Sequence, residues 1–371
     1  MRIVIIGEFS GFAKNLKEGF KRLGHTPFIY SWGDGFKKID SGKDSYTINV
    51  CNYTLFGKKI KGSNRIRSIL SALKLRAHLD IMWRKKKADA VLIINTAFLK
   101  TNHNAFSPYF SYEMIRKISS QETKIFLSAC GNDYIFNRYL PFCKKTNEFA
   151  ISKCISGLKI ERNNFLKYLS FVNEVIPVMA DYALAYRHFN TEFNYHVLST
   201  IPLPFDVSSV KVKNYFGEKI IVMHGITRPF EKGSYIILAA LEKLKKKYED
   251  KVDVKIVERV ALDEYLKIME EANIIVDQCY SYGYGMNAIE ALSMGKVVLS
   301  GNEEENQREF GIIECPVINI KPNADYIYDI LSNLISNPDK IKEISHESRI
   351  YAESIHDARV VAQRYIEMFN S

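Results

Sequence analysis

One carboxylate, Glu290, stands about one turn into an expected short helix that follows a turn with two glycines, Gly283 and Gly285. The apolar runs at 274–276, before the turn, and at 297–299, after the helix, are typical of buried parallel strands. Backbone N–H groups at such a helix N-terminus favour an anion, and a nearby carboxylate can accept the hydroxyls of a ribose. This order of elements predicts a site for a nucleoside diphosphate.

Two cations, Arg228 and Lys232, lie in an expected loop between a strand at 219–223 and a helix over 234–247. A leaving nucleoside diphosphate gains negative charge, and fixed cations stabilise that charge. The alternative interpretation of this segment is a solvated surface loop. Because the basic pair and the glycine turn lie in the same half of the chain, we expect them to serve one site.

GT-B glycosyltransferases, above all the retaining family 4 group, have a donor-binding motif that resembles the segment GYGMNAIEALSMGKVVLSG. Glu290 matches the second glutamate of that motif and Gly295 matches its glycine, whereas Tyr282 stands where the first glutamate would be. The loop with Arg228 and Lys232 resembles the basic segment that binds the donor pyrophosphate in the same family. Its arginine comes a few residues later than is usual there.

The resemblance implies a nucleotide-sugar donor and a set of residues that act on it. Catalysis would fall to Arg228, Lys232 and Asp133. Donor binding would fall to a larger set from three loops: Gly11, Gly225, Tyr282, Gly283, Gly285, Met286, Asn287 and Glu290. No metal and no other cofactor is expected, because the chain has no Asp-x-Asp motif and protein cations replace the ion in this family.

Two loops in the first half stand at the ends of expected strands, where α/β proteins bind ligands. Residues 7–11 include Gly11 and resemble the first loop of that family, which approaches the donor phosphate or the acceptor; a purely structural turn would look the same. Residues 128–133 carry Cys130 where the family often has a histidine. Asp133 either contacts sugar hydroxyls or the acceptor, or caps a helix.

Strands and helices alternate along the chain, which implies parallel sheets with helices on both faces. With the resemblance, this predicts an α/β protein of the GT-B fold class. Two doubly wound, Rossmann-like domains would face a central cleft, and a C-terminal helix would cross back to the first domain. The expected acceptor-binding domain is 1–206 with the helix 356–371, and the expected donor-binding domain is 207–355.

The expected elements follow from hydrophobic periodicity and turn residues. The expected strands are 3–6, 27–30, 90–94, 125–128, 219–223, 253–257, 274–277 and 297–300, and 175–179 leads into a strand or helix at 180–185. The expected helices are 12–23, 64–87, 112–119, 162–169, 234–247, 261–271, 287–294, 324–335 and a helical end, 338–370, with a break near 353–357.

Length and cysteine usage bound the class of protein. A chain of 371 residues suffices for two domains with full cores. No apolar run approaches the roughly 18 residues that span a bilayer, and the first residues, MRIVIIGEF, lack the features of a signal peptide. The six cysteines are scattered without a C-x-x-C pair, which argues against zinc and against a disulfide framework. We expect a cytoplasmic protein.

The net charge of +10 is unevenly distributed. Residues 1–205 hold 31 Lys and Arg against 15 Asp and Glu, a balance of +16, whereas residues 206–371 hold 21 against 27, a balance of −6. Such asymmetry points to an anionic partner for the first half, either nucleic acid, an anionic membrane surface or a lipid diphosphate.

One segment of the first half, the expected helix at 64–87, concentrates this basic charge. It ends in four consecutive cations, 84–87, beside Trp83, and it carries an apolar stripe of Ile66, Ile69, Leu70 and Leu73. It either lies on an anionic membrane surface or packs into its domain by the stripe, with a solvated basic face.

These observations favour a glycosyltransferase that moves a sugar from a nucleotide-diphosphate sugar to a glycan or lipid-diphosphate-linked acceptor. The resemblance implies retention of configuration, and a role in bacterial surface polysaccharide biosynthesis at the inner face of the membrane is a consistent setting. The alternatives are a nucleotide-sugar epimerase of the same fold, or a degenerate, non-catalytic homologue that acts as a partner subunit, since Tyr282 and Cys130 replace two expected site residues. No nucleic-acid partner is expected, because the chain has no recognised binding motif.

Overall fold

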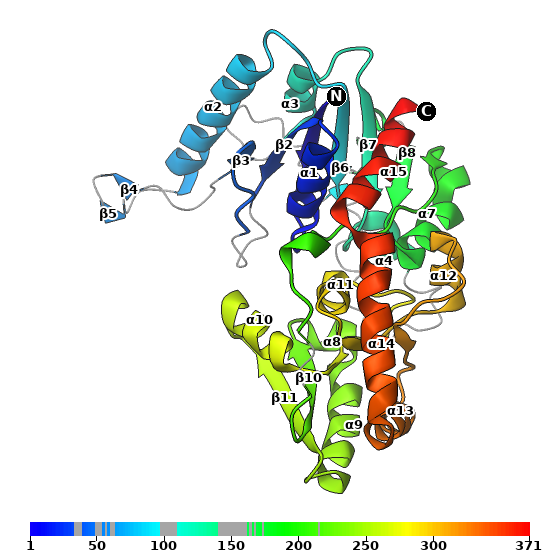
Figure 1. Cartoon of the computed structure of the whole chain (residues 1–371). Coiled ribbons are helices and arrows are strands. Elements are labelled where there is room, and N and C mark those ends of the chain that lie inside the picture. The colour runs from blue at the N-terminus through cyan, green and yellow to red at the C-terminus, as the bar shows by residue number, and fades with distance from the viewer. Residues whose placement is uncertain are drawn as a thin grey trace.

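A computed structural model describes residues 1–32, 39–48, 54–55, 58–59, 64–96, 110–139, 162, 165–166, 168–172, 174–213 and 216–371. It describes the side chains of all of these except 54–55, 58–59 and 64–68. The described chain forms two α/β domains, which lie one above the other in Figure 1.

The N-terminal domain is built on a parallel sheet of seven strands in the order β3-β2-β1-β6-β7-β8-β9. Its strands are β1 Arg2–Ile6, β2 Thr26–Ser31, β3 Ser45–Thr47, β6 Ala90–Ile94, β7 Lys124–Ala129, β8 Glu174–Pro177 and β9 His196–Val197. Its helices are α1 Phe12–Arg22, α2 Asn64–Met82, α3 Tyr112–Ile118, α4 Tyr134–Tyr139 and α7 Ala180–Phe193, and β4 Thr54–Leu55 pairs with β5 Lys58–Lys59 as a separate ribbon.

Both faces of this sheet are covered, as the continuous apolar strands predict. Successive side chains of a strand point to opposite faces. Ile3 and Ile5 of β1 pack in one core with α1 and the last helix of the chain, whereas Val4 and Ile6 pack in a second core with α2, α3 and α7.

The C-terminal domain is built on a parallel sheet of five strands in the order β11-β10-β12-β13-β14. Its strands are β10 Ile220–Ile226, β11 Val252–Glu258, β12 Ile274–Val276, β13 Val297–Ser300 and β14 Ile318–Asn319. Its helices are α8 Pro229–Lys232, α9 Ser234–Lys247, α10 Leu262–Glu271, α11 Met286–Ser293, α12 Glu304–Phe310, α13 Ala324–Ser336 and α14 Pro338–Tyr351.

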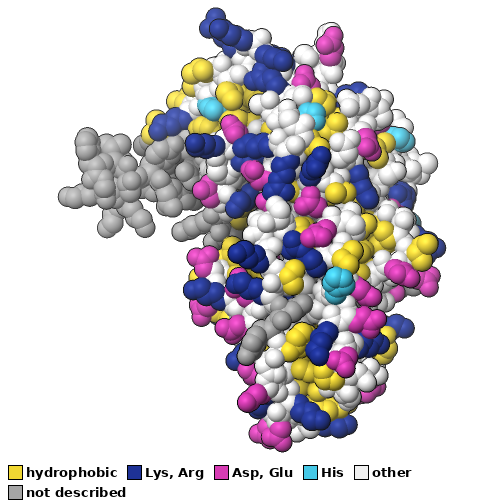
Figure 2. Space-filling view, in the orientation of Figure 1, with side chains coloured by type: hydrophobic (Ala, Val, Ile, Leu, Met, Phe, Trp, Pro, Cys, Tyr) yellow, Lys and Arg dark blue, Asp and Glu magenta, His cyan; other side chains and the backbone are white. Residues whose placement is uncertain are grey.

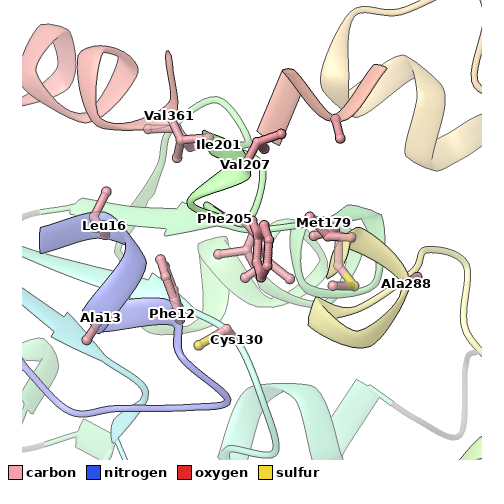
Figure 3. Packing of buried hydrophobic residues seen from close by; sticks show 14 of the residues in the cluster. Phe12, Ala13, Leu16, Cys130, Met179, Ile201, Phe205, Val207, Ala288 and Val361 are labelled. Atoms are coloured by element: carbon pink, nitrogen blue, oxygen red, sulfur yellow. The ribbon is translucent and has the colours of Figure 1, made fainter. Parts of the chain in front are cut away.

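The chain returns to the N-terminal domain through α14, a short π-helix at Ala352–His356, and α15, Ala358–Asn370. Helix α15 packs against α1 so closely that a Cβ on Gly19 would collide with the carbonyl oxygen of Ala358. Phe205, on the segment that leads into the second domain, pairs with Asp357 as an isolated parallel bridge. One hydrophobic core therefore runs through the crossing point, with Phe12, Phe205 and Val361 among its residues (Figure 3).

The predicted architecture of two doubly wound domains with a returning C-terminal helix is confirmed. Helix α9 has the predicted bounds, the predicted helix at 287–294 begins one residue earlier, and the helical end is interrupted where expected. The segment at 180–185 is helical, which is one of the two structures predicted for it. Residues 162, 165–166 and 168–169 are helical, and the rest of 162–169 lies outside the described residues. The domain boundary at 206 falls between the two sheets and stays a prediction.

Helix α2 corrects two predictions. It ends at Met82, so the basic residues 84–87 form a loop rather than the last turn of a helix. The apolar stripe was also misplaced, since Leu70 is 46% exposed, Leu73 is 49% exposed and Ile69 is only half-buried. Ile66 lies outside the described side chains. The buried face consists of Ala72, Leu75, Leu79 and Trp83.

Contacts of Trp83 with residues distant in the sequence explain why the end of α2 and its buried face differ from the prediction. Its ring is 2% exposed, and its Nε1 donates to the hydroxyl of Tyr30 at 2.8 Å. The guanidinium of Arg2 lies 4.5 Å from the ring and donates to the carbonyl oxygen of Lys86. These contacts fix the chain at the helix end, and a sequence pattern does not contain them.

Three cysteines fall among the described residues, namely Cys130, Cys279 and Cys315, and all three are free thiols. Cys51, Cys143 and Cys154 lie outside the described residues. Within the described ranges, no helix combines the length and the apolar character that crossing a bilayer requires.

Candidate active site

The glycine loop, residues 277–285 between β12 and α11, lies at the carboxyl ends of the C-terminal strands, where open α/β sheets bind ligands. Gly285 is the N-cap of α11, and the space beside its Cα is open. Gly283 is packed more closely, because a Cβ there would lie 2.8 Å from the amide oxygen of Asn306. The loop therefore leaves room at the helix N-terminus for an anion.

Glu290 is half-buried on α11, as the sequence predicts. Burial raises the pKa of its carboxyl group to about 7. A ligand hydroxyl that donates to this carboxylate would favour its charged form and lower the pKa again. The position and the poised charge suit the binding of a ribose, and that role stays a prediction.

Lys232 is buried at the end of α8 and forms an ion pair that the sequence did not reveal. Its Nζ lies 2.7 Å from Oδ1 of Asp277, the first residue of the glycine loop. Asn287 donates to the same oxygen at 2.9 Å. Burial alone would raise the pKa of Asp277, but the charge of Lys232 and the hydrogen bonds from Lys232 and Asn287 hold it below its usual value. The predicted cation is thus held in place by a partner on the glycine loop.

The other basic residue, Arg228, is exposed at the start of α8. It lies within electrostatic reach of Tyr182, the third residue of α7 in the opposite domain. Tyr182 also contacts the backbone of Gly131, and burial raises the pKa of its hydroxyl. Arg228 and the loop after β7 are therefore brought to the same place between the two domains.

Gly225 leaves space for the side chain of Tyr265. A Cβ at this position would collide with the hydroxyl of Tyr265, and that hydroxyl donates to Oδ1 of Asn287 at 2.6 Å. His224 beside it is also structural. Its ring nitrogens lie 2.7 Å from the carbonyl oxygen of Val276 and 2.9 Å from the hydroxyl of Ser234, and burial lowers its pKa to about 4.

The remaining residues predicted to bind the donor, Met286, Tyr282 and Gly11, do not all lie in the same domain. Met286 is half-buried at the first position of α11, and Tyr282 is buried, 9% exposed, in the glycine loop. Gly11 lies in the other domain, at the N-cap of α1 with a φ of 87° that suits glycine. Met286 and Tyr282 are thus close in sequence to Glu290, whereas Gly11 belongs to the facing edge.

Asp133 occupies the structural position that its sequence context also allowed. Its Oδ1 accepts a hydrogen bond from the backbone of Phe136 at 2.8 Å, which caps α4, and its Oδ2 accepts from the hydroxyl of Tyr186. Cys130 is buried beside it, and burial, followed by the charges of Asp133 and Glu8, raises the pKa of its thiol. A catalytic role for Asp133 stays a prediction.

Sequence reasoning missed three residues of the cleft: Asp277, Tyr265 and Asp181. Asp277 had a local signal, since a carboxylate directly follows a fully apolar strand. Tyr265 and Asp181 had none, because their partners lie 22 and about 100 positions away in the chain. Among the residues that the structure describes, no group of three His, Cys, Asp or Glu side chains could hold a metal ion.

No family model matches the chain, and no curated protein matches it. Solved structures do. Over 100% of its length the chain is similar to sucrose-phosphate synthase (tll1590) from Thermosynechococcus elongatus, with a TM-score of 0.62, 13% identity and 98% of that chain covered. It is similar over 100% of its length to Anabaena Alr3699/HepE in complex with UDP and glucose, with a TM-score of 0.60, 13% identity and 99% of that chain covered.

A third similar structure is a glycosyltransferase from Rickettsia africae ESF-5, with a TM-score of 0.57, 15% identity, and coverage of 100% of this chain and 97% of that one. At such identities the likeness shows the fold alone. The fold class is GT-B, as predicted.

Proposed function

We propose that this protein is a nucleotide-sugar-dependent glycosyltransferase. The observation that carries the proposal is the convergence of a glycine loop, a half-buried Glu290 and a buried Lys232 on the carboxyl ends of β10 and β12 in a GT-B fold. A nucleoside diphosphate has groups that match all of these features. Its phosphates suit the helix N-terminus and the cation, and its ribose hydroxyls suit the carboxylate.

The chemistry of the residues assigns them distinct roles. Glu290 accepts the ribose hydroxyls, and the N–H groups at the start of α11 face the diphosphate. Lys232 and Arg228 stabilise the negative charge that grows on the leaving diphosphate as its bond to the sugar breaks. Asp277 orients Lys232, so the ammonium group stays in place while the donor arrives. No metal ion is needed in this scheme, because protein cations and helix N–H groups neutralise the leaving group.

The donor is a nucleotide-diphosphate sugar, and we expect a hexosyl group to be transferred with retention of configuration, as the family 4 resemblance implies. UDP-sugars are the first donors to test, since the similar HepE was solved with UDP-glucose. The acceptor would be a glycan or a lipid-diphosphate-linked glycan, bound by the N-terminal domain, in the synthesis of a bacterial surface polysaccharide.

A basic, partly apolar surface suits an acceptor held at a membrane. The loop at 84–87 follows α2, where Ile81 is 80% exposed and Met82 is 39% exposed. In Figure 2, Lys and Arg side chains stand at the top of the view, at the end of the N-terminal domain away from the other domain. We propose that this end of a cytoplasmic protein contacts the anionic inner face of the membrane by apolar insertion and charge attraction.

A screen of nucleotides and nucleotide-sugars by thermal shift, followed by donor hydrolysis and transfer assays, tests the proposal. A ligand that binds only the folded state raises the melting temperature by mass action, so a hit identifies the donor class. Binding together with sugar release supports a glycosyltransferase. Binding without turnover on any acceptor would favour the non-catalytic homologue, and the absence of any nucleotide hit would contradict the proposed site.

A further inference from the structure

Asp181, in the first turn of α7, reaches from the N-terminal domain to the glycine loop of the C-terminal domain. Its Oδ1 accepts a hydrogen bond from the backbone N–H of Tyr282 at 3.1 Å. Its Oδ2 accepts from the backbone N–H of Gly283 at 3.1 Å and from the hydroxyl of Ser281 at 2.9 Å. One carboxylate therefore binds three consecutive residues of the loop.

Neighbouring contacts fix the start of α7 against the same loop. The backbone N–H of Ala180 donates to the amide oxygen of Asn306 at 3.2 Å, and Gly283 packs against that same oxygen. Met179, the N-cap of α7, belongs to the same hydrophobic core as Ala288 of α11 (Figure 3). The α7 N-terminus thus contacts α12 and shares a hydrophobic core with α11.

Asp181 is 7% exposed, and burying a carboxylate costs free energy that its hydrogen bonds must offset. Burial raises the pKa of Asp181, whereas the hydrogen bonds from Tyr282, Ser281 and Gly283 lower it. The net pKa is raised, so these bonds offset the cost of burial only in part. All three partners on the loop donate to this side chain, so its oxygens act as the acceptor for the loop in this conformation.

Position 282 is where the resembling motif has its first glutamate, and this chain has a buried tyrosine there. The backbone of that same residue is bound by the carboxylate of Asp181. We propose that Asp181 is a positioning residue that holds the glycine loop in its donor-binding conformation from the opposite domain.

This assignment couples the loop to the closure of the two domains. If the domains separate, Asp181 leaves and the N–H groups of Tyr282 and Gly283 lose this acceptor. The loop is then ordered only when the N-terminal domain is in place, so donor binding and domain closure favour each other. This inference rests on the proposed glycosyltransferase function only for its kinetic consequences, and the loop conformation can be measured without any activity.

Hydrogen exchange of the glycine loop tests the proposal in Asp181→Ala and in the isosteric Asp181→Asn. Local opening controls amide exchange, so loss of the acceptor should accelerate exchange at Tyr282 and Gly283 by about tenfold to a hundredfold. The matched control is Arg187→Gln, which breaks the ion pair between α7 and Glu309 of α12 but touches no residue of the loop. Exchange at the loop in this control should stay at the wild-type rate.

Kinetics give the second measurement, with the nucleotide-sugar found in the donor screen. Both Asp181 variants should raise the donor KM by about tenfold and leave the acceptor KM unchanged, whereas Arg187→Gln should change neither. If Asp181→Ala does not fold, Asp181→Asn carries both measurements, because it removes only the charge and one acceptor.

The two hypotheses fail in different ways. Accelerated loop exchange in a protein that binds no nucleotide would leave the positioning role standing and remove the glycosyltransferase proposal. Sugar transfer by the wild type, with loop exchange unchanged in both Asp181 variants, would overturn the positioning role alone. Equal acceleration in Arg187→Gln would overturn it too, since any loosening of the domains would then suffice.

Discussion

The two sheet edges that meet between the domains use their charged residues differently. On the C-terminal edge, Glu290 and Lys232 stand beside open helix N–H groups, one with a raised pKa and the other oriented by Asp277. On the N-terminal edge, Asp133 caps α4 and Asn95 donates to the carbonyl oxygens of Cys130 and Asn132, at 2.7 and 3.1 Å. The charged groups of the first edge match the proposed donor, whereas those described on the second edge bind its own loops.

If the C-terminal edge binds the donor as proposed, the specificity of the cleft for its donor resides in that domain. In the proposed site, the groups that match the fixed charges of a nucleoside diphosphate all belong to the C-terminal domain. The facing domain contributes Asp181 and Tyr182 from α7, and it supports the donor site from outside. Acceptor recognition by the N-terminal domain would then rest on overall charge and shape.

Lys232→Ala should have the largest effect. We expect kcat to fall by about a hundredfold to a thousandfold, with a smaller change in the donor KM, because the charge on the diphosphate grows in the transition state. Steady-state kinetics with varied donor measure both parameters. A rise in KM alone would make Lys232 a ground-state binder and contradict its proposed role.

The Lys232→Ala variant also leaves Asp277 buried without its cation, which costs about 3–5 kcal/mol of stability. Asp277→Asn in the same background is the control, since it removes the uncompensated charge. The double variant should regain most of the stability and none of the kcat. Recovery of activity in the double variant would show that Lys232 acts only through the fold.

Reversal of Arg84, Lys85 and Lys86 to glutamate should release the protein from anionic vesicles. Each cation near such a surface contributes about 1 kcal/mol, so we expect binding to weaken by about a hundredfold or more at low salt. Co-sedimentation with anionic and with neutral vesicles measures this. The matched control reverses Lys245, Lys246 and Lys247, exposed residues of the C-terminal domain, and should sediment like the wild type. Equal sedimentation of all three proteins would refute the membrane surface.

Glu290 should make nucleotide affinity depend on pH. With a pKa of about 7, the group is mostly protonated at pH 6 and mostly charged at pH 8. Because the charged form accepts the ribose hydroxyls, affinity should rise by about tenfold over this range. Nucleotide phosphates also titrate here, so the slope is taken as the difference between the wild type and Glu290→Gln. That variant should bind about 1–3 kcal/mol more weakly at pH 8, and parallel pH profiles would contradict the role of Glu290.

Asp133→Ala should have the smallest effect on the donor site. Loss of the α4 cap and of the hydrogen bond from Tyr186 should lower stability by about 1–3 kcal/mol. Nucleotide affinity should not change. Chemical denaturation and nucleotide titration measure the two quantities. A stable Asp133→Ala protein without activity would restore the catalytic role that the family resemblance implies, and it would remove the contrast between the edges.

Local patterns predicted most of the fold, and most successfully in the C-terminal domain. Helix α9 and the break after α14 were found from periodicity and from turn residues. The position of Glu290, about one turn into α11, was also predicted. The end of α2 was missed because Trp83 is fixed by Arg2 and Tyr30, which are distant in sequence.

Contacts across the cleft could not be predicted from one sequence. The Lys232–Asp277 pair joins residues 45 positions apart, and the bonds from Asp181 to the glycine loop join residues about 100 positions apart. Periodicity and turn residues describe a segment and its neighbours, whereas these bonds depend on how two sheets face each other. For the same reason the sequence did not reveal the hydrogen bond from Tyr186 to Asp133.

A crystal structure with the nucleoside diphosphate from the donor screen would test the central claim most directly. The account predicts ribose hydroxyls within hydrogen-bond distance of Glu290, and phosphates at the N-terminus of α11 and at Lys232. A nucleotide bound at the N-terminal edge, or one whose ribose lies away from Glu290, would contradict it.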